Sequence, residues 1–167
     1  MDVRIRPWVE DDAEALAAAV AESLAELRPW MPWASAEPQT VEARRAWIRA
    51  RADDPDDLFA IVADGAIAGS CGLHHRIGPH GLELGYWVTT PLTGRGIATA
   101  TVALLAREAF SRPGIDHVEI HHDSANAASA AVAHRAGFTR IADEPGHRFA
   151  DRAATTIWRL TRPEWEA

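Results

Sequence analysis

The chain has 167 residues, of which 47% are hydrophobic and 25% charged, and its formal net charge is −7. This length and balance are typical of one globular domain, so we expect a single domain spanning residues 1–167. One cysteine, Cys71, excludes an intramolecular disulfide and a four-cysteine zinc site, and the absence of lysine excludes a Walker A loop and a Schiff-base lysine. The acidic charge argues against a general nucleic-acid binder.

The N-terminal part predicts one strand and two helices. Apolar residues near alternate positions in 3–8 are typical of a short strand. An alanine-rich helix follows the acidic pair at 11–12 and ends near Leu27, because prolines interrupt the next segment. Thr40 can cap a second helix that runs to about Arg51.

The segment Arg28-Pro29-Trp30-Met31-Pro32-Trp33 joins these two helices and combines two tryptophans with two prolines. Proline restricts the backbone, so we expect a stiff, aromatic, non-helical stretch. It is either a loop packed on the core or one wall of a substrate cleft.

The middle of the chain predicts a meander followed by a helix. Three strands are expected, over Leu58–Ala63, Ile67–Leu73 and Leu82–Val88, with a tight turn at Asp64-Gly65. A turn-rich stretch over Thr89–Gly96 then leads into a helix from about Ile97 to Phe110.

The C-terminal part alternates strands and a helix. The expected elements are a strand over His117–His121, a helix over Asn126–Ala136 capped by Gly137, strands over Phe138–Ile141 and Thr155–Leu160, and a loop over Pro145–Ala153. Together with the meander, this order indicates a mixed α/β (α+β) sheet covered by helices.

The loop Thr93-Gly94-Arg95-Gly96 lies between a predicted strand and a predicted helix. A helix start presents unpaired N–H groups and partial positive charge, and glycines let the backbone curl around a bulky anion. This favours a phosphate or pyrophosphate cradle, to which Arg95 can add a charged contact. An ordinary glycine-bearing turn remains the alternative.

Three motifs in this order resemble the GNAT N-acetyltransferases. In the first, Glu83–Val88 precedes a loop similar to the family pattern Q/R-x-x-G-x-G/A, where Gly96 and Ala98 match and Thr93 replaces Gln or Arg. The second comprises Asn126-Ala127-Ala128-Ser129 and Ala136-Gly137-Phe138, which look like the family's N-x-x-S helix start and closing G-F. The third, Leu27–Trp33, is similar to the RimJ/RimL-type subgroup of ribosomal-protein N-terminal acetyltransferases.

The resemblance implies a fold and a cofactor site. The fold is a mixed, mostly antiparallel sheet of about seven strands, splayed in the middle and flanked by about four helices. Acetyl-CoA is the implied co-substrate, its pantetheine lying in the gap between the third meander strand and the strand near Val118. The implied cofactor-binding residues are Trp87, Val88, Thr89, Gly94, Arg95, Gly96, Ile97, Ala98, Thr99, Asn126 and Ser129. The implied acceptor wall is Trp30, Met31 and Trp33.

The resemblance also implies catalytic roles. Glu83 is the first candidate for general base, acting directly or through water, and Glu119 is its rival on the neighbouring strand. The usual GNAT acid, a tyrosine, is replaced by Ala133, and Tyr86 lies on the opposite strand face from Glu83. Ser129 is therefore expected to stabilise or protonate the departing thiolate.

Other chemical readings are weaker. Adjacent strand residues point to opposite faces, so His121 and His122 do not suit one metal ion, and no metal site is expected. The pair His74-His75 meets the same objection, although one of them could face the acceptor cleft as an alternative base. Cys71 is more typical of a small buried residue than of a nucleophile.

The sequence thus predicts an acetyl-CoA-dependent N-acetyltransferase acting on a primary amine, such as a protein α-amino group. A small-molecule amine (an antibiotic, polyamine or amino acid) and a non-catalytic acyl-CoA-binding module are the alternatives, and a nucleotide-binding domain is disfavoured. No signal peptide or membrane segment is visible, which with the single cysteine favours a cytoplasmic protein without a membrane partner. Seven tryptophans leave a homodimer open.

Overall fold

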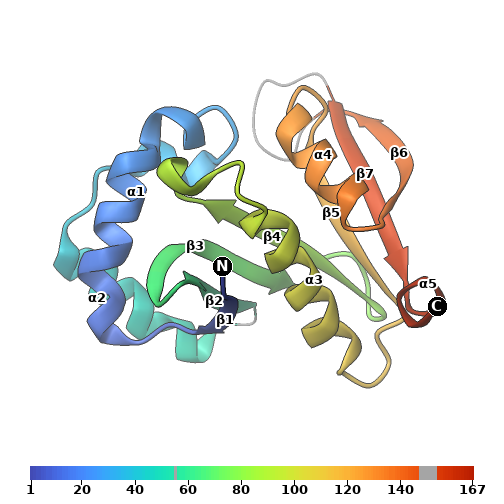
Figure 1. Cartoon of the computed structure of the whole chain (residues 1–167), viewed down its shortest axis with the longest axis horizontal. Coiled ribbons are helices and arrows are strands. Elements are labelled where there is room, and N and C mark those ends of the chain that lie inside the picture. The colour runs from blue at the N-terminus through green and yellow to red at the C-terminus, as the bar shows by residue number, and fades with distance from the viewer. Residues whose placement is uncertain (55, 147–153) are drawn as a thin grey trace.

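The computed structural model describes residues 1–54, 56–146 and 154–167 (Figure 1). Within these residues seven strands form one sheet in the order β1-β2-β3-β4-β5-β7-β6. The strands are β1 (Val3–Pro7), β2 (Asp57–Ala63), β3 (Ala66–His74), β4 (Gly81–Val88), β5 (His117–Asp123), β6 (Thr139–Pro145) and β7 (Ala154–Thr161). Among them β4 and β5 pair in parallel and the other neighbours pair antiparallel, which confirms the expected mixed sheet.

Five α-helices flank this sheet in the described parts of the chain. They are α1 (Ala13–Leu27), α2 (Val41–Ala50), α3 (Ile97–Phe110), α4 (Ala127–Arg135) and α5 (Arg162–Glu166). The first four were expected. The short α5 was missed, although Thr161 and Glu164 form a capping box, a signal that the sequence T-R-P-E carries. Most of the loop expected over Pro145–Ala153 lies outside the described residues.

The proline-rich segment is a second correction. Pro32–Ala36 forms a short 3-10 helix, η2, so Trp33 lies in a helical turn and not in a wholly non-helical stretch. Proline is tolerated there because the first residues of a helix need no N–H donor.

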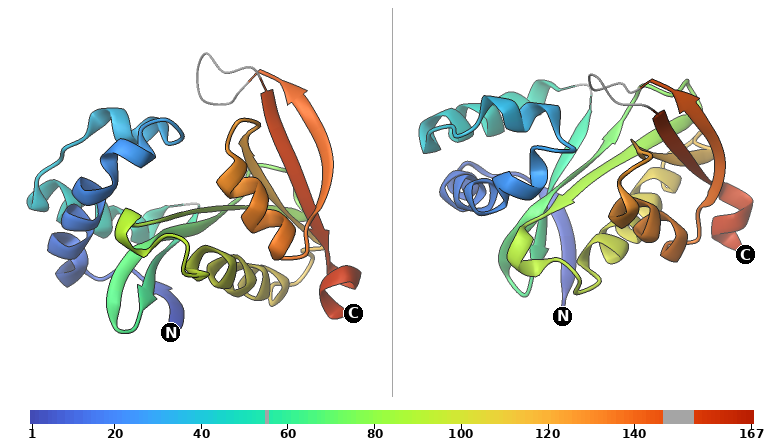
Figure 2. Two further views of the ribbon diagram at one scale, coloured as in Figure 1. Left: turned by 45° about the horizontal axis from the view of Figure 1, so that its top comes forward. Right: turned by 90° about the horizontal axis from the view of Figure 1, so that it is seen from above.

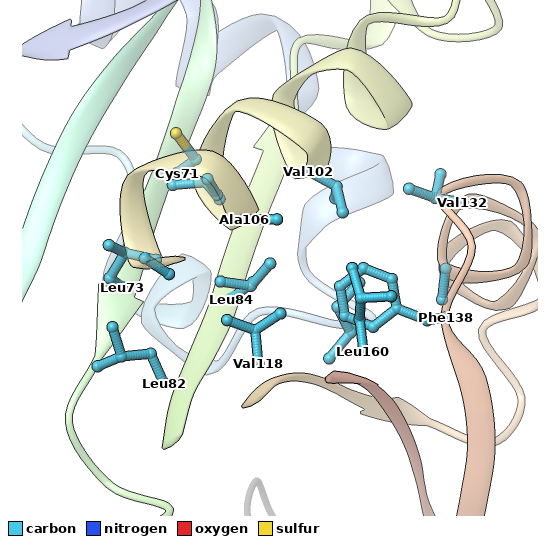
Figure 3. Packing of buried hydrophobic residues seen from close by; sticks show 14 of the residues in the cluster. Cys71, Leu73, Leu82, Leu84, Val102, Ala106, Val118, Val132, Phe138 and Leu160 are labelled. Atoms are coloured by element: carbon cyan, nitrogen blue, oxygen red, sulfur yellow. The ribbon is translucent and has the colours of Figure 1, made fainter. Parts of the chain in front are cut away.

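Helices cover both faces of the sheet (Figure 2), and a hydrophobic core lies beneath them on each face. On one face α3 packs against the central strands, and Figure 3 shows Val102 and Ala106 among the strand residues Leu73, Leu84 and Val118. On the other face α1 and α2 pack through the cluster that contains Trp8, Leu16, Val20 and Ile48. Burying apolar side chains on both faces fixes which side of each strand faces which helix layer.

The centre of the sheet opens between β4 and β5. Their pairing covers Gly81–Glu83 against His117–Glu119 and goes no further. Beyond it, β4 stays paired with β3 as far as Val88, while β5 follows β7 as far as Asp123. The two strands therefore diverge like the arms of a V, which confirms the expected splay.

No helix in the described ranges combines the length and the apolar character needed to cross a membrane.

Candidate functional site

A cavity of about 1390 Å³ lies where the sheet splays. Its walls come from α1, the 30–39 segment, β3, β4, the loop that leads into α3, the end of β5 and the first turns of α4. Elements far apart in the sequence therefore meet at one hollow, on both sides of the opened strand β4.

The glycine loop forms one end of this cavity. Gly94 and Gly96 have φ angles of 73° and 82°, which favour glycine. Gly96 is the N-cap of α3 and no side chain caps that helix end, so its first N–H groups face outward. A Cβ built on either glycine meets no atom within 4 Å. The open concave backbone at a helix N-terminus therefore fits a pyrophosphate.

The predicted cofactor residues are not all brought together. Trp87 and Val88 line the cavity, and so do Gly94, Gly96, Ile97, Ala98, Thr99, Asn126 and Ser129. Arg95 is exposed and is not part of the lining. Thr89 is turned away, because its N–H donates to the Ala68 carbonyl (2.8 Å) and its hydroxyl meets that of Ser23 (3.1 Å). Its backbone N–H is thus already used by the fold.

The start of α4 carries a hydroxyl pair. Asn126 caps the helix by accepting from the Ser129 N–H (3.1 Å), as expected for the N-x-x-S motif. The Ser129 hydroxyl lies 3.0 Å from the Tyr86 hydroxyl of β4 rather than bonding local backbone. Burial raises the pKa of Tyr86 to about 12, so this phenol keeps its proton near neutral pH. The sequence placed Tyr86 on the opposite strand face from Glu83, and its contact with Ser129 depends on the fold and not on local spacing.

Glu83 is buried at the floor of the cavity, where the splay begins. Both of its carboxylate oxygens accept from Arg76, at 2.9 Å from Nε and 2.6 Å from Nη2. Its Oε2 also lies 3.7 Å from Nδ1 of His121. Glu83 is therefore held in a bidentate ion pair with Arg76 at the point where the sheet opens.

Glu119, the rival base, is equally occupied. His121 Nε2 lies 2.5 Å from its Oε2, and Arg159 Nε donates to its Oε1 at 2.8 Å. Burial alone would raise the pKa of Glu119, but these hydrogen bonds outweigh it and hold the pKa below the usual 4.5. Glu119 is not part of the cavity lining, so it faces the network rather than the hollow.

This lowered pKa predicts a stability effect. A carboxyl with a depressed pKa in the folded state stabilises it above the unfolded value and loses that contribution as the pH falls. In Glu119→Gln, the free energy of unfolding should therefore fall less steeply than in the wild type as the pH drops below about 5. Urea unfolding at a series of pH values measures this slope, and Glu144→Gln, at an exposed position, is the control. Parallel slopes for Glu119→Gln and the wild type would contradict the assignment.

The other end of the cavity is aromatic. Trp30, Met31 and Trp33 all line it, as expected for the acceptor wall, and the Trp33 ring lies 5.9 Å from that of Trp87. The buried Glu37–Arg44 ion pair lies beside them. This end is therefore apolar, with a few fixed charges.

The histidines form separate contacts. His121 lies beside Glu119, whereas His122 on the opposite face accepts a hydrogen bond from Trp158 Nε1 (3.0 Å). In the described parts of the chain no three His, Cys, Asp or Glu side chains are grouped so as to hold a metal ion. Cys71 is buried, and burial raises the pKa of its thiol, which makes it a poor nucleophile.

A family model described as "Acetyltransferase (GNAT) domain" matches residues 2–139. The chain belongs to the GNAT acetyltransferase family. This membership confirms the resemblance and the expectation of an acetyl-CoA-dependent acyltransferase.

The GNAT relatives include a protein described as "Putative ribosomal N-acetyltransferase YdaF" from Bacillus subtilis (strain 168). It is 30% identical over 142 residues, which cover 81% of this chain and 77% of that protein. Among solved structures, a RimL described as a ribosomal L7/L12 alpha-N-protein acetyltransferase in complex with coenzyme A has a TM-score of 0.84 and 20% identity, covering 97% and 95% of the two chains. RimJ of Mycobacterium smegmatis, in complex with CoA-disulfide, has a TM-score of 0.83 and 23% identity, covering 97% and 83%. These two structures share the GNAT fold of this chain.

Proposed function

We propose that this GNAT protein transfers the acetyl group of acetyl-CoA directly to the α-amino group of a protein N-terminus. The observation that carries the proposal is one continuous cavity, which extends from the glycine loop to the tryptophan wall. Its volume of about 1390 Å³ exceeds the roughly 300–1,000 Å³ typical of a site for one small ligand. Direct transfer requires such room, because both substrates must be bound together.

The cofactor half of the cavity supports acetyl-CoA as donor. The N–H groups of the Gly94–Thr99 segment would hold the pyrophosphate at the start of α3. The pantetheine would lie in the gap beside Trp87 and Val88, where β4 has lost β5 as a neighbour. This path carries the thioester toward Ser129 and Tyr86, whose hydroxyls lie 3.0 Å apart.

The acceptor half supports an amine held by an apolar wall. Trp30, Met31 and Trp33 offer flat surface, while Glu26 and Glu83 provide negative charge for an incoming ammonium group. An α-amino group, with a pKa near 8, gives up its proton more readily than a lysine amine near 10.4. The description of RimL names an alpha-N-protein acceptor, and that of YdaF names a ribosomal N-acetyltransferase, which supports a protein acceptor here.

The chemistry asks for three events at the splay. The neutral amine nitrogen bonds to the thioester carbonyl carbon, the carbon–sulfur bond breaks, and the sulfur leaves with the electron pair. We assign Ser129 as the hydroxyl that donates to this sulfur, with Tyr86 behind it. Glu83, fixed by Arg76, would stabilise positive charge on the amine.

The acceptor class can be tested by mass spectrometry on the wild-type protein with acetyl-CoA. Three probes are needed: a lysine-free peptide with a free N-terminus, an N-terminally blocked peptide containing lysine, and spermidine. We expect one acetyl group on the first probe and little on the other two. Acetylation of spermidine alone would favour the small-molecule alternative, whereas acetyl-CoA binding without transfer to any amine would favour the non-catalytic module.

A further inference from the structure

An aspartate–histidine pair lies beside the acceptor half of the cavity. His74 ends β3 opposite Glu83, on the sheet face where Trp87 packs with α1 and α2. Its Nδ1 lies 2.6 Å from Oδ2 of Asp56, and the other carboxylate oxygen of Asp56 accepts from the His75 N–H at 3.0 Å. The ring of His74 is thus oriented by a carboxylate that is itself held in place.

The protonation pattern of this pair follows from Asp56. Burial alone would raise the pKa of Asp56, but the hydrogen bonds from His74 and the His75 N–H outweigh it, so the pKa is lowered. An ionised carboxylate can only accept hydrogen bonds, so Nδ1 of His74 must carry the proton that it shares. In the neutral ring the lone pair then resides on Nε2. No hydrogen bond occupies Nε2 within the described ranges, and His74 lines the cavity.

The position of Nε2 is defined by two glycines. A Cβ built on Gly85 would lie only 2.7 Å from Nε2, and one on Gly72 would lie 3.6 Å from it. The imidazole therefore occupies the space over β3 and β4 that two absent side chains leave. Gly85 comes two residues after Glu83, the last residue of β4 that pairs with β5. Nε2 consequently lies at the beginning of the splay.

The His74 ring and the hydroxyl pair of Tyr86 and Ser129 lie at neighbouring residues of β4, on opposite faces of the strand. On one face of β4, Nε2 of His74 lies directly above Gly85. Tyr86, the next residue, points to the opposite face and meets Ser129. Adjacent strand residues are about 3.3 Å apart along the strand and face opposite ways. Nε2 of His74, a proton acceptor, thus lies on the face of β4 toward the proposed amine site. The hydroxyl pair of Tyr86 and Ser129, which can donate hydrogen bonds, lies on the face toward the proposed cofactor site.

Building on the proposed function, we propose that His74, oriented by Asp56, is the general base of the transfer. Nε2 takes one proton from the amine nitrogen as this nitrogen bonds to the carbonyl carbon. The carbon–sulfur bond breaks and its electron pair goes to the sulfur, which accepts a hydrogen bond from the Ser129 hydroxyl and takes one proton from water. Ser129 keeps its own proton, and the products are the amide and the thiol of coenzyme A. Proton number and charge balance once His74 returns its proton to water.

Other charged groups share this cavity and must be separated from His74 in any pH profile. Those that line the cavity are Glu26, Glu37, Arg44, Arg76, Glu83, His121, His122, Asp123 and Arg135. Asp56 is not part of the lining and acts on His74 directly. Of these, Glu83 is the rival base, but both its oxygens accept from Arg76. Nε2 of His74, in contrast, has no hydrogen-bond partner among the described residues and lies in the cavity wall.

The experiment compares four variants with the wild type by steady-state kinetics over pH, using acetyl-CoA and a lysine-free peptide. His74→Gln should lower kcat/KM by about 100-fold, within the range for loss of a general base. In the plot of kcat/KM against pH it should also remove the fall on the acidic side (the acidic limb) that protonation of His74 causes. Asp56→Asn should lower kcat/KM by roughly 10-fold, because the ring loses its oriented tautomer. His75→Gln is the matched control, since His75 is exposed and does not line the cavity. Glu83→Gln should retain the His74 limb.

Two further measurements distinguish loss of the base from misfolding of the variant. The Kd of His74→Gln for acetyl-CoA should stay within about twofold of the wild type. Added imidazole should restore at least part of the activity of His74→Ala, because a free base can enter the space, and should leave the rate of Asp56→Asn unchanged. A structural role alone would predict no such rescue.

The outcomes are distinct. If the wild type transfers acetyl groups and His74→Gln keeps its rate and its acidic limb, or if Glu83→Gln removes the limb instead, the assignment of His74 is overturned while the proposed function stands. If the wild type transfers no acetyl group to any amine, the proposed function and this assignment both fail.

Discussion

Gly96→Glu should weaken acetyl-CoA binding by about 100-fold or more, equivalent to roughly 2.7 kcal/mol or more. Gly96 is the N-cap of α3, where the backbone N–H groups face the open end of the cavity. A glutamate there places negative charge and bulk at the position assigned to the pyrophosphate. Isothermal titration of the folded variant with acetyl-CoA measures the loss.

The control for Gly96→Glu must carry the same backbone strain. Gly114 follows α3, has a φ of 81° against 82° for Gly96, and is likewise open at its Cβ. It is not part of the cavity lining. Each substitution forces a side chain into the left-handed region at a cost of about 1–2 kcal/mol. Gly114→Glu should therefore lose similar stability and keep its affinity. Equal affinities for the two variants would refute the cradle.

Ser129→Ala should lower kcat by roughly 100-fold while changing the Kd for acetyl-CoA by less than about threefold. The hydroxyl of Ser129 contacts that of Tyr86 across the start of α4, and Asn126 holds the Ser129 N–H. Loss of a hydroxyl that donates to a departing thiolate affects the transition state more than the ground state. Steady-state kinetics combined with calorimetry separates the two effects.

Tyr86→Phe, alone and combined with Ser129→Ala, and the control Ser111→Ala test the Ser129 prediction further. Tyr86→Phe removes the second hydroxyl, and if the two act as one unit the double variant should be no slower than Ser129→Ala alone. Ser111→Ala, whose hydroxyl bonds the Glu108 carbonyl at 2.7 Å beyond the end of α3, should behave as the wild type. An unchanged kcat in Ser129→Ala would exclude Ser129 from the chemistry.

Local patterns explain why the elements could be predicted. Thr40 caps α2 by accepting from the Ala43 N–H (3.1 Å), and Asn126 caps α4 in the same way. Both caps act within three residues, so the sequence carries the whole signal. The glycine loop is equally local, since a strand, two glycines and a helix follow one another. The splay of the sheet was expected from the family resemblance and not from local pattern.

The contacts that distinguish one carboxylate from another are long-range. Arg159 reaches Glu119 from 40 residues away, and Tyr86 meets Ser129 across 43. Such pairs depend on which strands become neighbours, which a single sequence does not show. Glu83 therefore read as an available base, whereas the structure places its two oxygens on Arg76.

The sequence also shows which strand face Tyr86 and His74 occupy, but not which residues they meet there. Tyr86 was set aside because it does not share a face with Glu83, yet its face is the one on which Ser129 lies. The pair His74-His75 was set aside as a metal site because adjacent strand residues point to opposite faces, and one of the two was kept as an alternative base. The contact with Asp56, which no spacing rule gives, sets the orientation of His74. In both cases the residue type was visible and the partner was not.

The most direct test of this account is a calorimetric titration of the purified protein with acetyl-CoA, with coenzyme A and NAD as comparators. We expect one site per chain with micromolar affinity for acetyl-CoA, binding of coenzyme A, and no heat with NAD. This result, together with the loss of affinity in Gly96→Glu, would support donor binding in the splayed cavity and justify the acceptor screen. Absence of acetyl-CoA binding by the folded protein would contradict the account, because the roles of the glycine loop, Ser129 and His74 all depend on a donor bound there.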